Sequence, residues 1–399
     1  MLPVASTPVP ARSAVPTARI ETFLAEERRE TPFLVVDCDV VLDRYAELRV
    51  AVPSAAIFYA VKANPAPELL DALVHAGSSF DVASPGEIDL ALAAGADPAK
   101  LSYGNTIKKR TDIARAHELG VRMFAFDAAD ELAKLTAEAP GSTVFCRVLC
   151  DGAGSDWPLS RKFGCDVDQA VELCLRAIDA GHQVGVCFHV GSQQKQPDAY
   201  RVAIELVAEQ IAAPLAAAGG RLSHLNVGGG FPGTYLTTGP ATAVYGAVIE
   251  RTVARCFGDD PPVLITEPGR FLAADAGVIE TEVVLVARKS LHDEHRWVFL
   301  DIGLFGGLAE CLGEAIKYPI VTVEGDDGGP TGPVVLAGPT CDSADVLYEE
   351  FRYRLPMSLG AGDRLRLLAT GAYTTTYAAV AFNGFPPLRT YHLPPSRRA

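Results

Sequence analysis

The sequence has 399 residues, of which 49% are hydrophobic and 21% are charged. This length excludes a small disulfide-stapled module, and the hydrophobic content excludes an intrinsically disordered chain. The formal net charge of -14 excludes general nucleic-acid binding, because an acidic surface repels a polyanion. We therefore expect two or three domains, or one large barrel with an addition, and a small-molecule partner.

The cysteines and the N-terminus indicate the cellular compartment. Nine cysteines occur without a CxxC pair, which favours free thiols in a reducing cytosol and indicates no metal site. Prolines interrupt residues 1–18 where a signal peptide would need an apolar run, and no apolar stretch reaches about 18 residues. We expect a cytoplasmic protein with no contact to membrane, whose residues 1–18 form a disordered tail.

A unit of strand followed by helix recurs from residue 37 to residue 275. The preceding segment, 19–36, carries two short apolar runs, and we expect it to join the C-terminal domain. The eight predicted strands are 57–61, 80–83, 101–104, 123–126, 145–149, 184–190, 224–228 and 263–266, with Ala- and Leu-rich helical stretches between them. This pattern predicts a (β/α)8 barrel with a parallel interior sheet, and a doubly wound open sheet is the competing architecture.

Residues 276–399 have a different pattern, with strands, turns and little helix. The predicted strands are 278–288, 297–300, 320–323, 334–337 and 364–368, and Gly, Pro and Asp punctuate the turns between them. We therefore expect a separate β-domain, a sandwich or a barrel, after the α/β domain.

Residues with chemical potential follow several of the predicted barrel strands. Lys62 follows the first strand, His189 ends the sixth, residues 228–230 follow the seventh, and Glu267 and Arg270 follow the eighth. Active sites of such barrels lie at the carboxyl ends of the strands, so these groups should converge on one mouth. A lysine there is either a solvated surface residue or a partly desolvated Schiff-base nucleophile with a lowered pKa.

The other strand-end residues also have two interpretations each. The glycines 228–230 either cup a phosphate with consecutive N–H groups or only form a tight turn. Arg270 can supply the matching cation, because barrel phosphate sites favour the loops after strands seven and eight. Glu267 either holds a heterocycle nitrogen protonated or forms a salt bridge with Arg270. His189 either stacks on a planar cofactor or is a structural residue.

Six segments, in this order along the chain, resemble the PLP-dependent decarboxylases of the alanine-racemase fold, and among them the ornithine/lysine decarboxylases. They are YAVKANP at 59–65, HVGSQ at 189–193, GGGFPG at 228–233, EPGRF at 267–271, GPTCDSAD at 338–345 and GAYTTTYAAVAFNGF at 371–385. The resemblance extends from about residue 30 to about residue 390. It implies a (β/α)8 barrel with a C-terminal β-domain, and pyridoxal 5'-phosphate (PLP) as the cofactor.

The resemblance also implies how the chain holds PLP. Lys62 would bind the cofactor covalently, His189 would stack on its pyridine ring, and Glu267 would bond the ring nitrogen. The phosphate would be held by Ser192, Gly228, Gly229, Gly230, Arg270 and Tyr373, and the covalent bond would be supported by Asp81 and Arg147. Racemases of this fold place an arginine opposite the ring nitrogen, so Glu267 favours decarboxylation.

The substrate residues are implied to come from the β-domain. Cys341 would protonate Cα after CO2 leaves, and Asp342 would bind the distal ammonium of the substrate, with Glu314 as a further carboxylate candidate. In the family these groups enter the site from the other subunit of a head-to-tail homodimer. Lys162 and Asp345 match a pair that bridges this interface.

The predicted reaction is PLP-dependent decarboxylation of a basic L-amino acid, ornithine or lysine, to the diamine and CO2. The alternatives are decarboxylation of arginine, diaminopimelate or a specialised-metabolite amino acid, an amino-acid racemase on the same fold, and a non-catalytic PLP carrier. Cys341 and the β-domain count against the carrier. The segment 151–161, rich in Gly, Ser and Asp, is expected to be a mobile lid, with a plain surface loop as the alternative. The pathway, polyamine or specialised metabolism, stays open.

Overall fold

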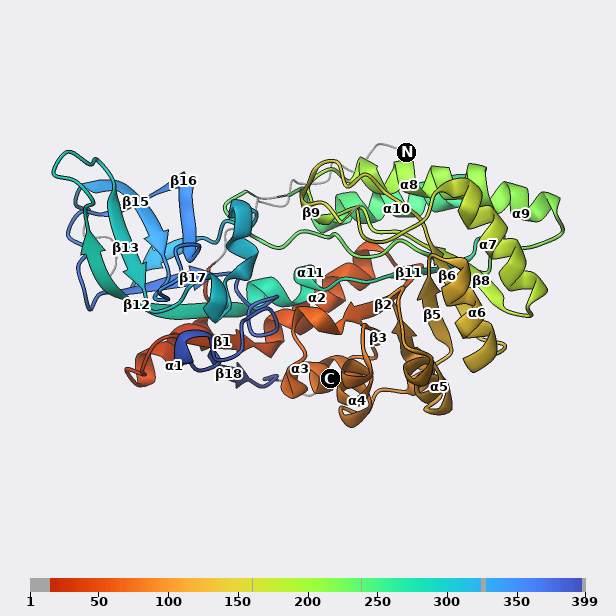
Figure 1. The fold of residues 1–399 in the computed structure, drawn as a ribbon, viewed down its shortest axis with the longest axis horizontal. Coiled ribbons are helices and arrows are strands. Elements are labelled where there is room, and N and C mark those ends of the chain that lie inside the picture. The colour runs from red at the N-terminus through yellow and green to blue at the C-terminus, as the bar shows by residue number, and fades with distance from the viewer. Residues whose placement is uncertain (1–14, 160, 238, 324–327, 397–399) are drawn as a thin grey trace, which may run out of the picture.

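The computed structural model describes residues 15–159, 161–237, 239–323 and 328–396. The barrel and the β-domain lie at opposite ends of the molecule (Figure 1). Of the segment predicted as a tail, residues 1–14 lie outside the described residues. Thr17 is the N-cap of helix α1 (Ala18–Glu26), and its side chain accepts a hydrogen bond from the N–H of Ile20.

Eight parallel strands form a closed barrel in the order β10-β11-β2-β3-β4-β5-β6-β8. They are β2 (Ala55–Ala60), β3 (Ser79–Val82), β4 (Leu101–Tyr103), β5 (Met123–Phe126), β6 (Thr143–Arg147), β8 (Gln183–Cys187), β10 (His224–Asn226) and β11 (Val263–Thr266). The prediction of a (β/α)8 barrel is confirmed and the open sheet is excluded, because β11 pairs with β2 and closes the ring.

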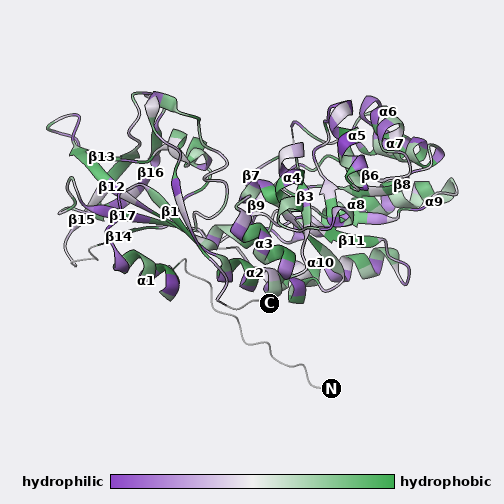
Figure 2. Ribbon diagram, turned by 90° about the horizontal axis from the view of Figure 1, so that it is seen from below, coloured by the Kyte–Doolittle hydropathy of each residue, from purple (hydrophilic) through white to green (hydrophobic). Residues whose placement is uncertain are grey.

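Helices surround the barrel strands and contribute buried residues to the core. They are α2 (Cys38–Ala51), α3 (Pro67–His75), α4 (Pro85–Ala93), α5 (Arg110–Glu118), α6 (Ala129–Glu138), α7 (Val167–Asp179), α8 (Asp198–Val207), α9 (Ala213–Ala217), α10 (Thr242–Phe257) and α11 (Arg270–Ala273). Helix α3 is an example. It begins at Pro67, a position where a backbone N–H would have no acceptor within the helix, and its Leu69, Leu70 and Leu73 side chains are fully buried. Burial of each leucine stabilises the fold by about 1.5–3 kcal/mol. Hydrophilic and hydrophobic bands alternate along these helices (Figure 2).

The second domain is a mixed sheet in the order β14-β17-β12-β13-β15-β16. In addition, β1 pairs with β12, and β18 pairs with β1. The strands are β1 (Phe33–Asp37), β12 (Gly277–Ala287), β13 (Arg296–Leu300), β14 (Ile320–Thr322), β15 (Thr331–Ala337), β16 (Val346–Pro356), β17 (Arg364–Leu368) and β18 (Arg389–Leu393). β1 pairs antiparallel with β12 and parallel with β18, so segments near both ends of the chain complete this sheet. The apolar run at 20–24 lies in α1, where Ile20 packs into a cluster with Phe33 and Val278.

A small two-stranded sheet occupies part of the segment predicted as a lid. β7 (Ser155–Trp157) pairs antiparallel with β9 (Ser192–Gln194), and Lys195 binds Asp156 at 2.6 Å. Residue 160 lies outside the described residues, and movement of this segment stays a prediction. Within the described ranges, no helix is both long enough and apolar enough to cross a membrane.

Candidate active site

A cavity of about 460 Å³ lies at the carboxyl ends of the barrel strands. Parallel strands deliver the residues that follow them to one mouth, so residues far apart in sequence meet there. Of the residues predicted for the site, those that line the cavity are Lys62, Asp81, Arg147, His189, Ser192, Glu267 and Tyr373. Asn226, which the sequence analysis did not single out, lines it as well.

Lys62 lies in a 3-10 turn directly after β2, and its Nζ donates a hydrogen bond to Oδ2 of Asp81 at 2.8 Å. The Asp81 carboxylate packs directly against Gly104. Any other residue at position 104 would clash with it, because an added Cβ would lie 2.1 Å from Oδ1 of Asp81. Burial disfavours the charge on Lys62, but Asp81, Tyr373 and Glu267 outweigh it and raise the pKa of the amine. The expectation of a lowered pKa is therefore wrong, because the Asp81 carboxylate lies within hydrogen-bond distance of the amine.

Glu267 follows β11, is half-buried and lines the cavity. Burial and the neighbouring Asp81 raise its pKa to about 7, while Lys62 and a 2.5 Å hydrogen bond from the Asn226 amide lower it. A cationic partner would favour the ionised form, and a protonated heterocycle nitrogen is such a partner. The alternative salt bridge to Arg270 does not form, because Arg270 binds Glu310.

The raised pKa of Glu267 predicts a pH dependence of stability in the cofactor-free protein. Between about 4.5 and about 7 the folded carboxyl keeps a proton that the unfolded one has released, so stability falls as pH rises through this window. The slope attributable to one such group is at most about 1.4 kcal/mol per pH unit. Glu267→Gln should remove it in urea denaturation series, whereas Glu280→Gln, remote from the cavity and paired with Arg364, should not. The same slope in Glu267→Gln would contradict the assignment.

His189 presents a neutral imidazole to the cavity. The N–H of Gly191 donates to its Nδ1 at 3.0 Å, so the remaining ring proton belongs on Nε2. Burial, together with the cations of Arg147 and Lys62, lowers the pKa of this imidazole to about 3. A flat, uncharged ring at this position suits stacking on a planar aromatic cofactor.

The glycine segment 228–230 forms a turn that excludes side chains. An added Cβ at Gly228, Gly229 or Gly230 would lie 2.2, 2.5 or 2.7 Å from a backbone oxygen, and φ is positive at the first and third. Only glycine fits these constraints. Ser192 lies close to this turn, because the backbone N–H of Gln194, in the same strand, donates to the carbonyl of Gly230.

The groups that line the cavity fit PLP. Lys62 offers a primary amine and His189 a neutral aromatic ring. Glu267 offers a carboxyl group whose raised pKa favours a cationic partner. The glycines 228–230 are not among the described residues that line the cavity; they pack against neighbouring backbone, and the Gly228 N–H donates to Oδ1 of Asn226 at 2.9 Å. The three cavity groups correspond to the aldehyde, the ring and the ring nitrogen of the cofactor, and phosphate binding by the glycine turn stays a prediction.

Tyr373 joins the C-terminal segment to the cavity. Its backbone is left-handed, with φ +58°, and its N–H donates to the carbonyl of Ala63 at 2.8 Å, beside Lys62. The Arg270 guanidinium lies 4.9 Å from the centre of the Tyr373 ring and donates through Nε to Ser192 Oγ at 3.1 Å. Arg270 itself is not among the described residues that line the cavity.

Cys341 and Asp342 lie apart from this cavity. Both are exposed, and neither belongs to the described residues that line it. The Cys341 backbone N–H donates to Oδ1 of Asn383 at 3.0 Å, which places the cysteine beside the C-terminal segment. A single chain therefore does not bring its own Cys341 to Lys62.

Two further predicted carboxylates are used inside the chain. Glu314 accepts hydrogen bonds at 2.7 Å from the N–H groups of residues 349–351, where β16 bulges from its partner. Asp345 is only 2% exposed and accepts three bonds, from the Leu304 N–H and from the N–H and hydroxyl of Thr340. The pairings of Glu314 with substrate and of Asp345 with Lys162 stay predictions, and each carboxylate already accepts three hydrogen bonds within the chain.

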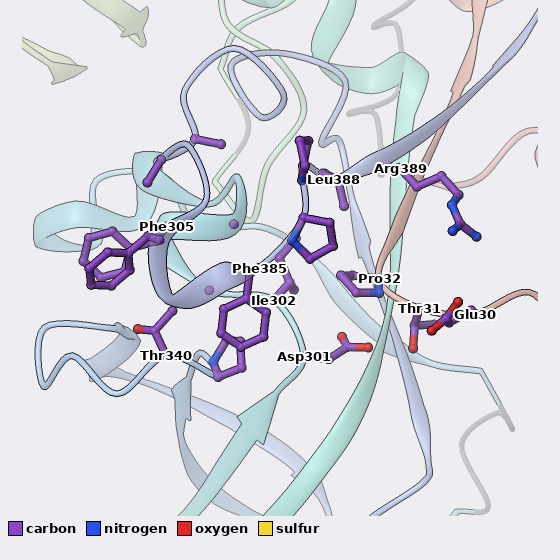
Figure 3. Close-up of a pocket in the computed structure, with 18 residues that line it drawn as sticks. Glu30, Thr31, Pro32, Asp301, Ile302, Phe305, Thr340, Phe385, Leu388 and Arg389 are labelled. Atoms are coloured by element: carbon purple, nitrogen blue, oxygen red, sulfur yellow. The ribbon is translucent and has the colours of Figure 1, made fainter.

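A second cavity, of about 170 Å³, lies between segments 30–32, 301–306 and 378–389 (Figure 3). Glu30, Thr31 and Arg389 stand on one side of it, and Phe305 and Thr340 on the other. Its described lining contains no lysine, histidine or cysteine. Amine and imidazole chemistry therefore belongs to the barrel cavity.

Sequence reasoning missed Asn226 and Glu310 for different reasons. Asn226 fell inside the predicted strand 224–228, whereas β10 ends at residue 226, so the strand-end rule would have found it with a correct boundary. Glu310 lies in an irregular segment of the second domain and no local pattern marks it.

Comparison with known proteins agrees with this geometry. Residues 39–274 match the model of the family described as pyridoxal-dependent decarboxylase, pyridoxal binding domain. The lysine/ornithine decarboxylase of Selenomonas ruminantium is 35% identical, over 90% of this chain and 88% of its own. The Vibrio vulnificus lysine/ornithine decarboxylase, solved with putrescine, superposes with a TM-score of 0.82 at 31% identity, over 95% of this chain and 99% of its own.

A third similar protein acts on a different basic amino acid. The arginine decarboxylase of Paramecium bursaria Chlorella virus superposes with a TM-score of 0.85 at 27% identity, over 94% of this chain and 100% of its own. The family match spans more than half of the chain, and the barrel mouth carries the groups predicted to hold PLP. The chain therefore belongs to the PLP-dependent amino-acid decarboxylases of the alanine-racemase fold.

Proposed function

We propose that this enzyme decarboxylates a basic L-amino acid, ornithine or lysine, to the diamine and CO2. Glu267 is the observation that carries the proposal: a half-buried carboxyl group that lines the cavity would hold a cofactor ring nitrogen protonated. The names of the relatives from Selenomonas and Vibrio support the choice of substrate.

Each residue of the cavity has a separate role in the proposed reaction. Bound PLP supplies a sink for the electrons left at Cα when CO2 departs. Glu267 would hold the ring nitrogen of the cofactor in its protonated form, and His189 would contact the ring as a neutral imidazole, since its pKa is lowered. Asp81 orients the Lys62 amine and stabilises its charged form.

We further infer that the active enzyme is a homodimer with shared sites. Cys341 would donate a proton to Cα, and it is exposed and remote from its own cavity. Large apolar side chains near it in the C-terminal segment are exposed too: Val380 by 93%, Tyr377 by 48% and Phe385 by 40%. Exposed apolar groups of this size mark interaction surfaces, and a second copy of the chain would cover them.

Asp342 is the carboxylate we assign to the distal cation of the substrate. It is exposed on the same loop as Cys341, whereas the carboxylate of Glu314 is held by three backbone amides. Burying an ammonium group without a carboxylate would be costly, so one acidic partner is required.

We infer a reducing, cytoplasmic location from the thiols. All nine cysteines are free, and most of them are buried within the barrel or the second domain. A secreted protein of this cysteine content would more often carry disulfides.

Release of CO2 from a panel of L-amino acids tests the substrate. We expect kcat/KM for ornithine or lysine to exceed that for diaminopimelate by roughly a hundredfold or more, because a second carboxylate beside Asp342 would be repelled. Activity on arginine alone would move the substrate to the guanidino class. Chiral chromatography of the same reactions detects racemisation. Inversion at Cα without formation of an amine would show that the enzyme is a racemase and not a decarboxylase.

A further inference from the structure

The guanidinium of Arg270, predicted to bind the cofactor phosphate, is already held by an acid from the other domain. Its Nη1 and Nη2 donate to Oε2 and Oε1 of Glu310 at 2.6 and 2.5 Å. The two side chains are only 4% and 7% exposed. Arg270 begins helix α11 at the end of the barrel, and Glu310 lies in the 3-10 turn Ala309–Glu314 of the second domain.

Few donors of this guanidinium remain for a phosphate. Nη1 also donates to the Tyr235 hydroxyl at 2.9 Å, and Nε donates to Ser192 Oγ at 3.1 Å. These four hydrogen bonds use four of the five N–H groups of an arginine, which leaves one on Nη2. The positive charge is matched by the Glu310 carboxylate in the same buried pair.

We propose that Glu310 is a positioning residue of the phosphate site, which holds the plane of Arg270 and competes with the phosphate for its charge. The inference rests on the proposed function, in which the phosphate is that of PLP. Ser192 keeps a hydroxyl proton to donate, because its oxygen accepts from Nε of Arg270. The phosphate is then bound mainly by neutral donors and the single remaining N–H.

A thermodynamic cycle gives the sign of the expected effect. Without Glu310, Arg270 would be a buried cation that lacks a counter-ion in the cofactor-free protein, which is destabilising. A bound phosphate would supply the missing negative charge, so removal of Glu310 should strengthen anion binding while it weakens the empty protein. A residue that only oriented Arg270 would give the opposite sign.

Titration of the cofactor-free full-length protein with inorganic phosphate tests this. We expect Glu310→Gln to bind phosphate more tightly by on the order of tenfold, and PLP to raise its Tm by more than it raises that of the unchanged protein. Pyridoxal, which has no phosphate, should bind both proteins equally. Glu310→Asp, which keeps the charge on a shorter side chain, should tighten phosphate binding by a smaller factor than Glu310→Gln does.

Glu280→Gln is the matched control. Glu280 is also buried and paired with Arg364, at 2.8 Å, but it lies in the sheet of the second domain. It should lower Tm without changing phosphate affinity. Unchanged or weaker phosphate binding in Glu310→Gln would overturn the inference. If that variant does not fold, Glu310→Asp should tighten binding by a smaller factor, and no tightening there would overturn it too. Failure of the unchanged protein to bind PLP would instead overturn the proposed function.

Discussion

Lys62→Ala is expected to abolish both the visible absorption of the bound cofactor and CO2 release. The primary amine is the only part of the side chain that can bond the PLP aldehyde, and it is held toward the cavity by Asp81 at 2.8 Å. Loss of the covalent partner should reduce kcat by roughly three orders of magnitude or more. Absorption spectra and CO2 release measured on the same preparation check both parts.

Lys62→Arg is the matched variant for this prediction. It keeps a cation beside Asp81 and so preserves the ion pair, but a guanidinium is a poor nucleophile at neutral pH. After PLP is added and the unbound PLP is removed, both variants should lack the visible band of covalently bound cofactor, whereas only Lys62→Ala should leave Asp81 buried without its cation. A visible band in either variant would remove Lys62 from the proposed role.

Mixing two inactive proteins is expected to restore activity if the sites are shared between subunits. Cys341→Ala alone should slow turnover by about 10²–10⁴, because it removes a proton donor. In an equal mixture with Lys62→Ala, random exchange makes half of the dimers mixed, and each mixed dimer has one intact site. Activity should therefore recover to about a quarter of the unchanged enzyme.

The mixture distinguishes a shared site from a site within one chain. If Cys341 served the Lys62 of its own chain, no mixed dimer would contain an intact site, and the mixture would stay inactive. The control is a mixture of Lys62→Ala with Lys62→Arg, in which no dimer has a competent lysine. Sedimentation of the unmixed proteins should show dimers; monomers with full activity would refute the shared site.

The parts of the fold that sequence patterns predict are those with a local signal. Eight apolar runs, each followed by a helical stretch, predict the barrel because buried parallel strands need continuous apolar side chains. Strand β16 escapes this rule, since Glu349 and Glu350 lie exposed in its middle where the strand bulges. β18 escapes it because its residues are only half-buried and it depends on pairing with β1.

The same distinction holds within the site. Lys62, His189 and Glu267 could be placed at the mouth because strand ends of a barrel converge by geometry alone. Glu310 could not, because it meets Arg270 across a domain boundary and 40 residues of chain. Glu314 and Asp345 were assigned to substrate and interface from their motifs, whereas backbone amides folded onto both carboxylates.

Length and charge first allowed two or three domains and excluded nucleic acid as a partner. The order of strands, the lysine after the first of them and the glycine turn after the seventh were determined by the sequence, because each depends on neighbours a few residues away. The charge state of each site group was decided only in the tertiary structure. Burial raises the pKa of Glu267, and Asp81 reverses the effect of burial on Lys62. Electrostatic energies of buried groups depend on partners brought close by folding, and no local pattern records them.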